Sequence, residues 1–257
     1  PYSSFPYREL YQASGGDPAR LLALRYKRML AEAGVESGKM VLYGMIDAGL
    51  AHAVFSYLQR ELPGLEIVGD LREELILAAM LTKDTDEVER IRRMGKITVG
   101  VVGRVADWLS GHASRDGVLV DPDGRALTLG DAHRRINLWL AEAGAENPEN
   151  TIFAIGHDAG VPHSLGNPKD LLRLGETIVF DIFPCEAGGG YFYDFTRTWC
   201  LGYAPEATQR LYEDVFSVYR QLESELKVGV GCGLIQQRAC ELFEVQGHPT
   251  MLHTPQT

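Results

Sequence analysis

Two aspartates lie in neighbouring apolar segments that have the composition of β-strands. Asp181 is at the centre of residues 177–183, and Asp194 lies within residues 191–199. The glycines at 188–190 separate the two segments and can form a tight reversal of the chain. Runs of aromatic and β-branched residues on either side of a glycine turn are typical of a β-hairpin. The sequence therefore predicts two adjacent strands that each carry one carboxylate.

Two carboxylates on neighbouring apolar strands could bind a divalent cation. Burying an ionised carboxylate costs several kcal/mol even after relaxation (on the order of 5), and two of them repel each other. Hard divalent metals favour carboxylate oxygens and supply the opposite charge. In a second interpretation, one aspartate pairs with Arg197 or accepts a hydrogen bond from a backbone N–H, while the other faces solvent. The spacing of the two residues leaves both interpretations open.

The alternation of side chains along a strand predicts which residues share a face. Asp194, Thr196 and Thr198 should lie on one face of the second strand, and Arg197 should lie on the other. Thr196 is therefore the hydroxyl that we expect beside the Asp194 carboxylate.

The residues around both aspartates resemble the pita-bread metallopeptidases, which include methionine aminopeptidases, Xaa-Pro aminopeptidases and Xaa-Pro dipeptidases (prolidases). Their signature is an Asp that ends an apolar strand, a Gly-Tyr-containing hairpin, and then Asp-x-Thr-Arg-Thr followed closely by Gly. The matching residues here are Asp181, Gly190-Tyr191, Asp194 to Thr198, and Gly202. The resemblance extends over roughly residues 71–257. The α/β pattern before it is similar to the extra domain of the proline-specific members.

The resemblance implies a catalytic centre with two divalent metal ions, manganese, cobalt or zinc, held by two Asp, one His and two Glu. Asp181 would be a bidentate ligand of one metal, and Asp194 would bridge both. Thr196 would orient the bridging carboxylate or a metal-bound water that acts as the nucleophile. His163, located 18 positions before Asp181, matches the catalytic histidine that contacts substrate. The alternative for His163 is a loop residue without a role.

This sequence departs from the family pattern in two respects. Asp181 and Asp194 are 13 positions apart, about two residues more than is usual, which a longer turn can absorb without changing either face. In addition, His248 and His253 lack the expected His-Gly context, and no Glu follows Glu244. We expect three of the five ligands to lie beyond this sequence, so that this chain alone binds metal weakly and is inactive.

The resemblance implies a metal-dependent peptidase that hydrolyses the bond before proline, with a proline-containing peptide as substrate and a homodimer as the assembly. A non-catalytic pita-bread protein that binds a peptide or protein partner is the alternative. A metal-free hydrolase of the creatinase kind is disfavoured, because such enzymes lack the Asp pair.

The expected fold is an α/β N-terminal part followed by an incomplete α+β pita-bread fold. The first domain would span residues 1–75 and the second residues 76–257. The chain starts without Met, and we expect both domains to be incomplete at their outer ends. Helical patterns are predicted for residues 18–34, 48–62, 71–109, 129–143, 205–226 and 234–245, and strands for residues 39–43 and 65–68.

Composition excludes several other classes of protein. The net charge is −10, from 35 acidic and 25 basic residues, which disfavours a nucleic-acid-binding surface. No apolar run in the sequence is long enough to span a membrane, so we expect no membrane-spanning segment. The four cysteines form no Cys-x-x-Cys pair, so a structural zinc site is disfavoured. Sparse thiols favour reduced cysteines and a cytoplasmic location.

Overall fold

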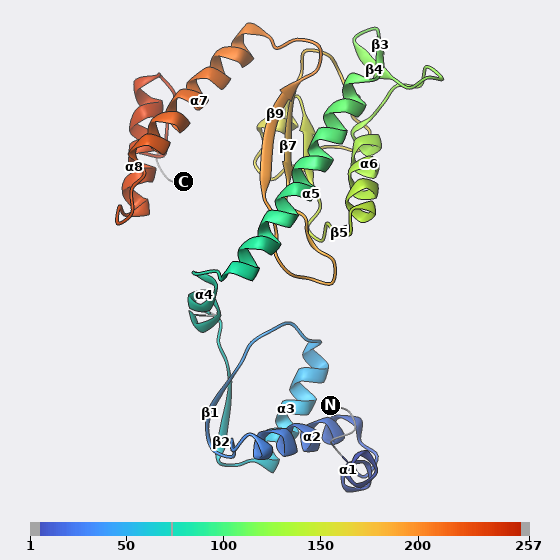
Figure 1. Cartoon of the computed structure of the whole chain (residues 1–257), viewed down its shortest axis with the longest axis vertical. Coiled ribbons are helices and arrows are strands. Elements are labelled where there is room, and N and C mark those ends of the chain that lie inside the picture. The colour runs from blue at the N-terminus through green and yellow to red at the C-terminus, as the bar shows by residue number, and fades with distance from the viewer. Residues whose placement is uncertain (1–5, 73, 253–257) are drawn as a thin grey trace. The chain divides into compact units, whose positions relative to one another are not determined.

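The computed structural model describes residues 6–72 and 74–252. Its contacts divide the chain into two compact units, residues 1–83 and 84–257 (Figure 1). The sequence predicts a domain boundary between residues 75 and 76, on the basis of resemblance to other proteins. The contact division uses a different criterion, so the predicted domains, 1–75 and 76–257, stay a prediction. Within the described ranges, no helix is both long and apolar enough to cross a membrane.

The first unit is a small α/β layer, as its alternating sequence pattern indicates. Its strands β1 (Gly38–Leu42) and β2 (Leu65–Gly69) are parallel, and α3 (Ala48–Glu61) connects them. The two other major helices are α1 (Tyr7–Ser14), which the sequence analysis missed, and α2 (Pro18–Glu32). The short helix α4 (Glu74–Met80) ends the unit. The predicted helices and strands of this unit are confirmed to within a few residues.

A capping aspartate fixes the start of α2 and connects it to α3. Asp17 Oδ1 accepts hydrogen bonds from the backbone N–H groups of Ala19 and Arg20. Its other oxygen accepts a hydrogen bond of 2.7 Å from the Tyr57 hydroxyl on α3. These bonds lower the pKa of Asp17 below its ordinary value, with the Tyr57 hydrogen bond as the largest cause. The two helices thus pack around a small core formed by Ala23, Val54, Leu58, Leu62 and Leu65.

The second unit carries both candidate aspartates. Its helices are α5 (Thr85–Ser110), α6 (Leu129–Glu142), α7 (Glu206–Glu225) and α8 (Cys232–Val245). Its main sheet has the antiparallel order β6 (Ile152–Ile155), β7 (Thr177–Ile182) and β9 (Phe195–Cys200). Two strand pairs complete it: β3 (Ala113–Arg115) with β4 (Val118–Val120), and β5 (Ala145–Glu146) with β8 (Cys185–Glu186).

The helix α5 begins at the capping box that the sequence predicts. Asp84 Oδ1 accepts from the backbone N–H of Glu87 at 2.9 Å, and Glu87 Oε2 accepts from the backbone N–H of Asp84 at 2.7 Å. Gly95 lies further along this helix, where an added Cβ would stand 2.7 Å from the ring of Tyr193. The absence of a side chain at Gly95 therefore lets the segment before β9 pack closely on α5.

One face of the three-stranded sheet packs against α5 and α6 and forms the larger core. Ile178, Phe180 and Ile182 of β7 are fully buried on this face. Phe180 makes edge-to-face contacts with Phe153 of β6, at a centroid distance of 5.0 Å, and with Trp199 of β9, at 5.4 Å. This alternate burial along β7 leaves Asp181 on the opposite face.

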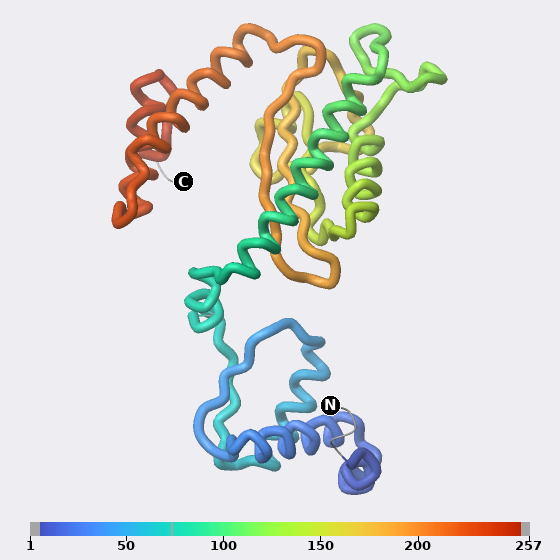
Figure 2. The backbone as a smooth tube through the Cα atoms, viewed as in Figure 1, coloured from blue at the N-terminus to red at the C-terminus, as the bar shows by residue number. Residues whose placement is uncertain are grey.

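The predicted hairpin is confirmed in its pairing and in the position of its glycine turn. The regular second strand begins at Phe195 and not at Tyr191, but the two limbs before it stay paired: the backbone N–H of Tyr193 donates to the carbonyl oxygen of Pro184 at 3.1 Å, and that of Glu186 donates to the carbonyl oxygen of Tyr191 at 3.2 Å (Figure 2). The β8 segment of this connection also pairs with β5. The glycines 188–190 lie at the turn, where all have positive φ, as expected from their conformational freedom.

Replacing Phe180 should destabilise the second unit strongly. We expect Phe180→Ala to lower its free energy of unfolding by about 3–5 kcal/mol, because it leaves a cavity between two aromatic rings. Urea unfolding followed by tryptophan fluorescence measures this unit selectively, since Trp108, Trp139 and Trp199 all lie in it. Phe192→Ala, at a half-exposed ring, is the control and should cost much less. Equal losses in the two variants would contradict the packing described.

Candidate metal centre

The pairing of β7 with β9 brings Asp181 and Thr196 together. The two residues are register partners in the antiparallel ladder. Thr196 Oγ1 donates a hydrogen bond of 2.6 Å to Asp181 Oδ1. Both side chains lie on the face opposite Phe180, so the carboxylate oxygens of Asp181 stay outside the core.

Asp194 lies just before β9 and contacts Asp181. Its carboxyl group lies beside that of Asp181, and the backbone N–H of Phe195 is also close to it. Burial, and then the negative charge of Asp181, raise the pKa of Asp194 above its ordinary value of 3.8. The structure therefore brings together the two carboxylates that the sequence analysis selected.

The second interpretation of the two aspartates, in which one pairs with Arg197 or binds a backbone N–H, agrees with the structure only in part. Arg197 forms no ion pair with either aspartate in the described residues: it donates to the carbonyl oxygen of Thr196 at 2.7 Å and lies 3.8 Å from the centre of the Phe195 ring. The backbone N–H of Phe195 lies close enough to Asp194 to lower the pKa of its carboxyl group, which matches part of the second interpretation of the two aspartates. Thr196 shares the face of Asp194, as predicted, but its hydrogen bond goes to Asp181. Its role at a metal centre stays a prediction.

His163 is exposed in a turn that follows β6. The backbone N–H of Ser164 donates to the carbonyl oxygen of Val161 at 3.1 Å, which closes the turn, and His163 has a φ of 61°. A positive φ is uncommon for a residue with a side chain. No hydrogen bond connects His163 to Asp181 or Asp194 in the described part of the chain, so its predicted contact with substrate stays a prediction.

Three further histidines have structural partners. A ring nitrogen of His112 lies 2.7 Å from the carbonyl oxygen of Trp108. His133 lies 3.2 Å from the carbonyl oxygen of Leu165, and burial lowers its pKa. His248, one of the two C-terminal histidines, lies 3.0 Å from a carboxylate oxygen of Asp214. The other one, His253, is outside the described residues.

The donor set fits part of a divalent metal site. Two aspartates in contact offer hard oxygen ligands, and their mutual repulsion is the feature that a cation would relieve. Within residues 6–72 and 74–252, no group of three or more His, Cys, Asp and Glu side chains is arranged to hold a metal ion. Asp181 and Asp194 would therefore supply two ligands of a site that needs others.

A buried acidic residue near Asp194 was missed by the sequence analysis. Glu186 of β8 is only 8% exposed and forms ion pairs with Arg90 and Arg93 of α5. Hydrogen bonds from Arg90, which outweigh the effect of burial, lower the pKa of Glu186 to about 2. An acidic residue just before the glycine turn could have indicated a buried ion pair. Its arginine partners, however, lie more than 90 positions away in the sequence.

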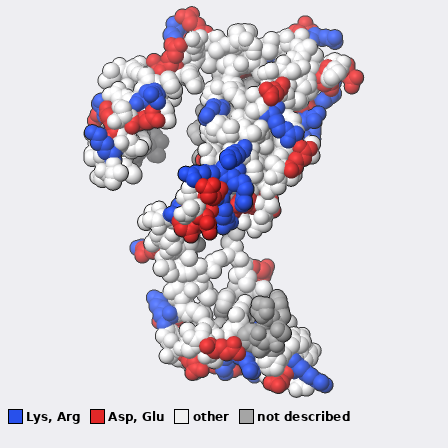
Figure 3. All heavy atoms as spheres, viewed as in Figure 1, with Lys and Arg blue, Asp and Glu red and all other residues white. Residues whose placement is uncertain are grey.

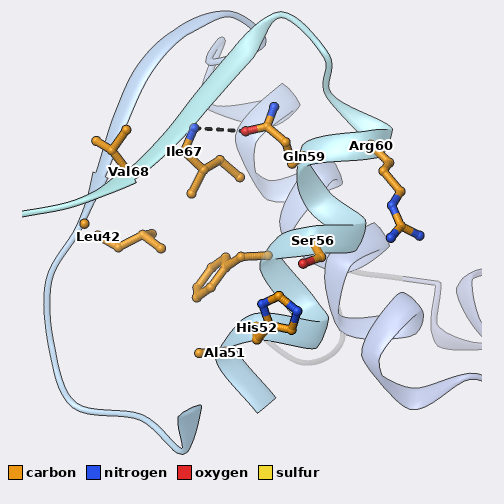
Figure 4. A pocket seen from close by; sticks show the side chains of 10 residues that line it. Leu42, Ala51, His52, Ser56, Gln59, Arg60, Ile67 and Val68 are labelled. Carbon is orange, nitrogen blue, oxygen red and sulfur yellow. Dashed lines mark hydrogen bonds between the residues drawn. The ribbon is translucent and has the colours of Figure 1, made fainter. Parts of the chain in front are cut away.

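A pocket in the first unit is lined by a different set of side chains. A pocket of about 520 Å³ lies between α3 and β2 and includes His52, Ser56 and Arg60, but no acidic residue. Figure 4 shows Gln59 at its edge, where the side-chain oxygen accepts from the backbone N–H of Ile67 at 3.1 Å. This pocket offers no carboxylate ligands and is not a candidate metal centre.

Removing one of the two carboxylates should stabilise the metal-free chain. Because the pKa of Asp194 is higher in the folded state than the ordinary value of 3.8, its ionisation destabilises the fold as the pH rises above that value. We expect Asp194→Asn to melt at a higher temperature than the wild type at pH 7 in EDTA, and the difference to shrink as the pH falls towards 3.8. Asp123→Asn, at an exposed turn, is the control. A lower melting temperature for Asp194→Asn at pH 7 would contradict the proposed repulsion.

A comparison with protein families places most of the second unit in one family. Residues 89–254 match the model of metallopeptidase family M24. Among curated proteins, none matches the sequence significantly.

Solved structures of related fold include three with informative names. An X-Pro aminopeptidase from Thermotoga maritima MSB8 is 17% identical, with a TM-score of 0.67 over 88% of this chain and 57% of that one. A prolidase from Thermococcus sibiricus is 20% identical, with a TM-score of 0.65 over 90% and 56%. An Xaa-Pro dipeptidase from Bacillus anthracis is 14% identical, with a TM-score of 0.65 over 88% and 57%.

These likenesses show the fold. The chain has the mixed α/β fold of the pita-bread peptidase structures and spans a little over half of their length. The family match covers more than half of this chain and includes Asp181 and Asp194. The chain belongs to metallopeptidase family M24.

Proposed function

We propose that the protein to which this chain belongs is a metal-dependent peptidase that hydrolyses the peptide bond before proline. The observation that carries this proposal is the contact between the carboxyl groups of Asp181 and Asp194 in a chain of family M24. The names of the structural neighbours, X-Pro aminopeptidase, prolidase and Xaa-Pro dipeptidase, support the proline specificity.

Several residues of this chain would have distinct roles in such a reaction. Asp181 and Asp194 would hold the cations through their oxygens, and Thr196 would keep the Asp181 carboxylate in one orientation through its hydrogen bond of 2.6 Å. Two divalent ions, when bound, lower the pKa of a water molecule and polarise the carbonyl group of the substrate. His163 would donate a hydrogen bond to the bound peptide from its turn. The remaining ligands would come from groups outside the described residues.

A non-catalytic protein of the same fold is the second candidate. The observation in its favour is that the described residues contain no cluster of three metal-binding side chains. In such a protein, the face that carries Asp181 would bind a peptide or a protein partner without cleaving it.

The homodimer and the cytoplasmic location also stay predictions.

Hydrolysis of proline peptides tests the proposal directly. We expect the full-length protein with Mn²⁺ or Co²⁺ to cleave Ala-Pro or Ala-Pro-Ala but not Ala-Ala, with activity lost in EDTA. Asp194→Asn should lower kcat/KM at least about a thousandfold because it would remove one of the two carboxylates that hold the metal, whereas Asp123→Asn should retain the wild-type kcat/KM.

The outcomes separate the candidates. Normal turnover by Asp194→Asn would contradict the role of this carboxylate, and equal cleavage of Ala-Ala would contradict the proline specificity. Peptide binding without cleavage by the metal-loaded protein would support the non-catalytic candidate.

Replacing His163 should slow the turnover of substrate without changing the amount of bound metal. We expect His163→Ala to lower kcat/KM by about 10- to 100-fold, the cost of one lost hydrogen bond to a developing charge, with metal content unchanged by atomic absorption. His157→Ala, which alters an exposed histidine of the same loop, is the matched control. Loss of bound metal in His163→Ala would show that its role is different.

A further inference from the structure

The loop between β7 and β9, residues 183–194, is anchored at several points along its length. Its β8 segment pairs with β5, and the backbone N–H of Gly188 donates to Glu146 Oε1 at 2.9 Å. At its base, the backbone N–H of Tyr193 donates to the carbonyl oxygen of Pro184 at 3.1 Å. The Tyr193–Pro184 bond belongs to the hairpin itself, whereas the pairing with β5 and the bond to Glu146 tie the loop to other parts of the unit.

The most extensive of these anchors joins Glu186 to α5. Arg90 donates to both carboxylate oxygens of Glu186 from Nε, at 3.2 and 3.0 Å. Arg93 donates to Oε1 at 2.6 Å, and the backbone N–H of Tyr191 donates to Oε2 at 3.2 Å. Both Glu186 oxygens are therefore saturated. Figure 3 shows acidic and basic side chains gathered together over the N-terminal part of α5.

Tyr191 adds a second connection to the same helix. Its hydroxyl donates to Glu87, and the Arg90 guanidinium lies 4.9 Å from the centre of its ring, within the range of a cation–π contact. A side chain at Gly190 would collide with the Glu186 carboxylate. The Gly190-Tyr191 pair of the sequence motif is thus explained by this close approach. We refer to Glu87, Arg90, Arg93, Glu186 and Tyr191 as the α5 latch.

The α5 latch ends three residues before Asp194. Three residues of extended chain span at most about 11 Å, and this short stretch is further fixed by Tyr193, whose ring lies against Gly95 of α5. Asp194 itself precedes the first residue of β9 and lies between two cross-strand connections, Phe195 with Ile182 and Tyr193 with Pro184. The position of its carboxylate therefore depends on these connections and on the latch that fixes the rest of the loop.

The carboxylate pair needs such a restraint. Like charges in contact push each other apart, and Asp194 is in a loop that could move away from Asp181. Ion pairs such as Arg90–Glu186 are weak evidence for stability by themselves, because apolar residues often pack as well in their place. A network that fixes geometry accounts better for four charged side chains and a tyrosine at this point.

We propose that Arg90, Glu186 and Tyr191 are positioning residues that hold Asp194 beside Asp181 and thereby set the affinity of the site for divalent cations. The proposal rests on the function proposed above only in that it takes the two aspartates as metal ligands. It assigns the latch to the assembly of the site and not to contact with substrate or metal.

Binding of Mn²⁺ tests the proposal without any assay of activity. The metal-free full-length protein is titrated with MnCl₂, and free Mn²⁺ is measured by its electron paramagnetic resonance signal. We expect Glu186→Gln to raise the Kd about tenfold or more, as is typical when a partner of a metal ligand is lost. Tyr191→Phe, which removes only the bond to Glu87, should raise it less. Arg92→Ala, which breaks an exposed ion pair with Glu89 on the same helix, should leave it unchanged.

A double substitution separates positioning from general loss of structure. If the latch acts through Asp194, Glu186→Gln should weaken Mn²⁺ binding in the wild type but have no further effect in the Asp194→Asn background. Amide hydrogen exchange of the metal-free protein should also become faster at residues 191–195 in Glu186→Gln and Tyr191→Phe, with the core strand β7 unchanged.

Each outcome decides the proposal. A Kd within twofold of the wild type in both Glu186→Gln and Tyr191→Phe overturns it and leaves the proposed function intact. Equal effects of Glu186→Gln with and without Asp194 also overturn it. Wild-type protein that binds no Mn²⁺ overturns both this proposal and the proposed function. Latch-dependent Mn²⁺ binding in a protein that cleaves no peptide supports the latch and contradicts only the function.

Discussion

The register of β7 against β9 is the constraint on which the candidate site depends. Side chains alternate along each strand, so a slip of one residue would turn Asp181 into the core and Phe180 out of it. The full burial of Phe180 between two aromatic rings prevents that slip. The same register places Thr196 opposite Asp181. Packing on one face of the sheet thus decides which carboxylate and which hydroxyl meet on the other.

Asp194 lies just before the first residue of β9, next to the backbone bond between Tyr193 and Pro184. Its contact with Asp181 is electrostatically unfavourable without a cation, which is consistent with its raised pKa. Two sources of rigidity oppose this repulsion: the apolar core, which fixes Asp181, and the ion pairs of Glu186 with α5, which fix the loop that carries Asp194. A site that must bind a cation tightly is expected to be held in this way before the cation arrives.

Local sequence patterns were sufficient for the main helices, for β7 and for the shared face of Asp194 and Thr196. Each depends on periodicity or capping within a few residues, as at Asp84 and Glu87. The late start of β9, the bond of Thr196 to Asp181 and the burial of Glu186 depend on residues far away in the chain. Glu186, for example, meets Arg90 across 96 positions. No short window of sequence contains that information.

The central claim is that Asp181 and Asp194 act as one cation-binding unit. A double-mutant cycle on Mn²⁺ affinity, with Asp181→Asn, Asp194→Asn and the double variant, tests it most directly. If both carboxylates hold the same metal centre, either single substitution abolishes most of the binding and the double variant is hardly weaker than the weaker single one. Losses that simply add, or a single substitution that leaves the Kd unchanged, would contradict the account.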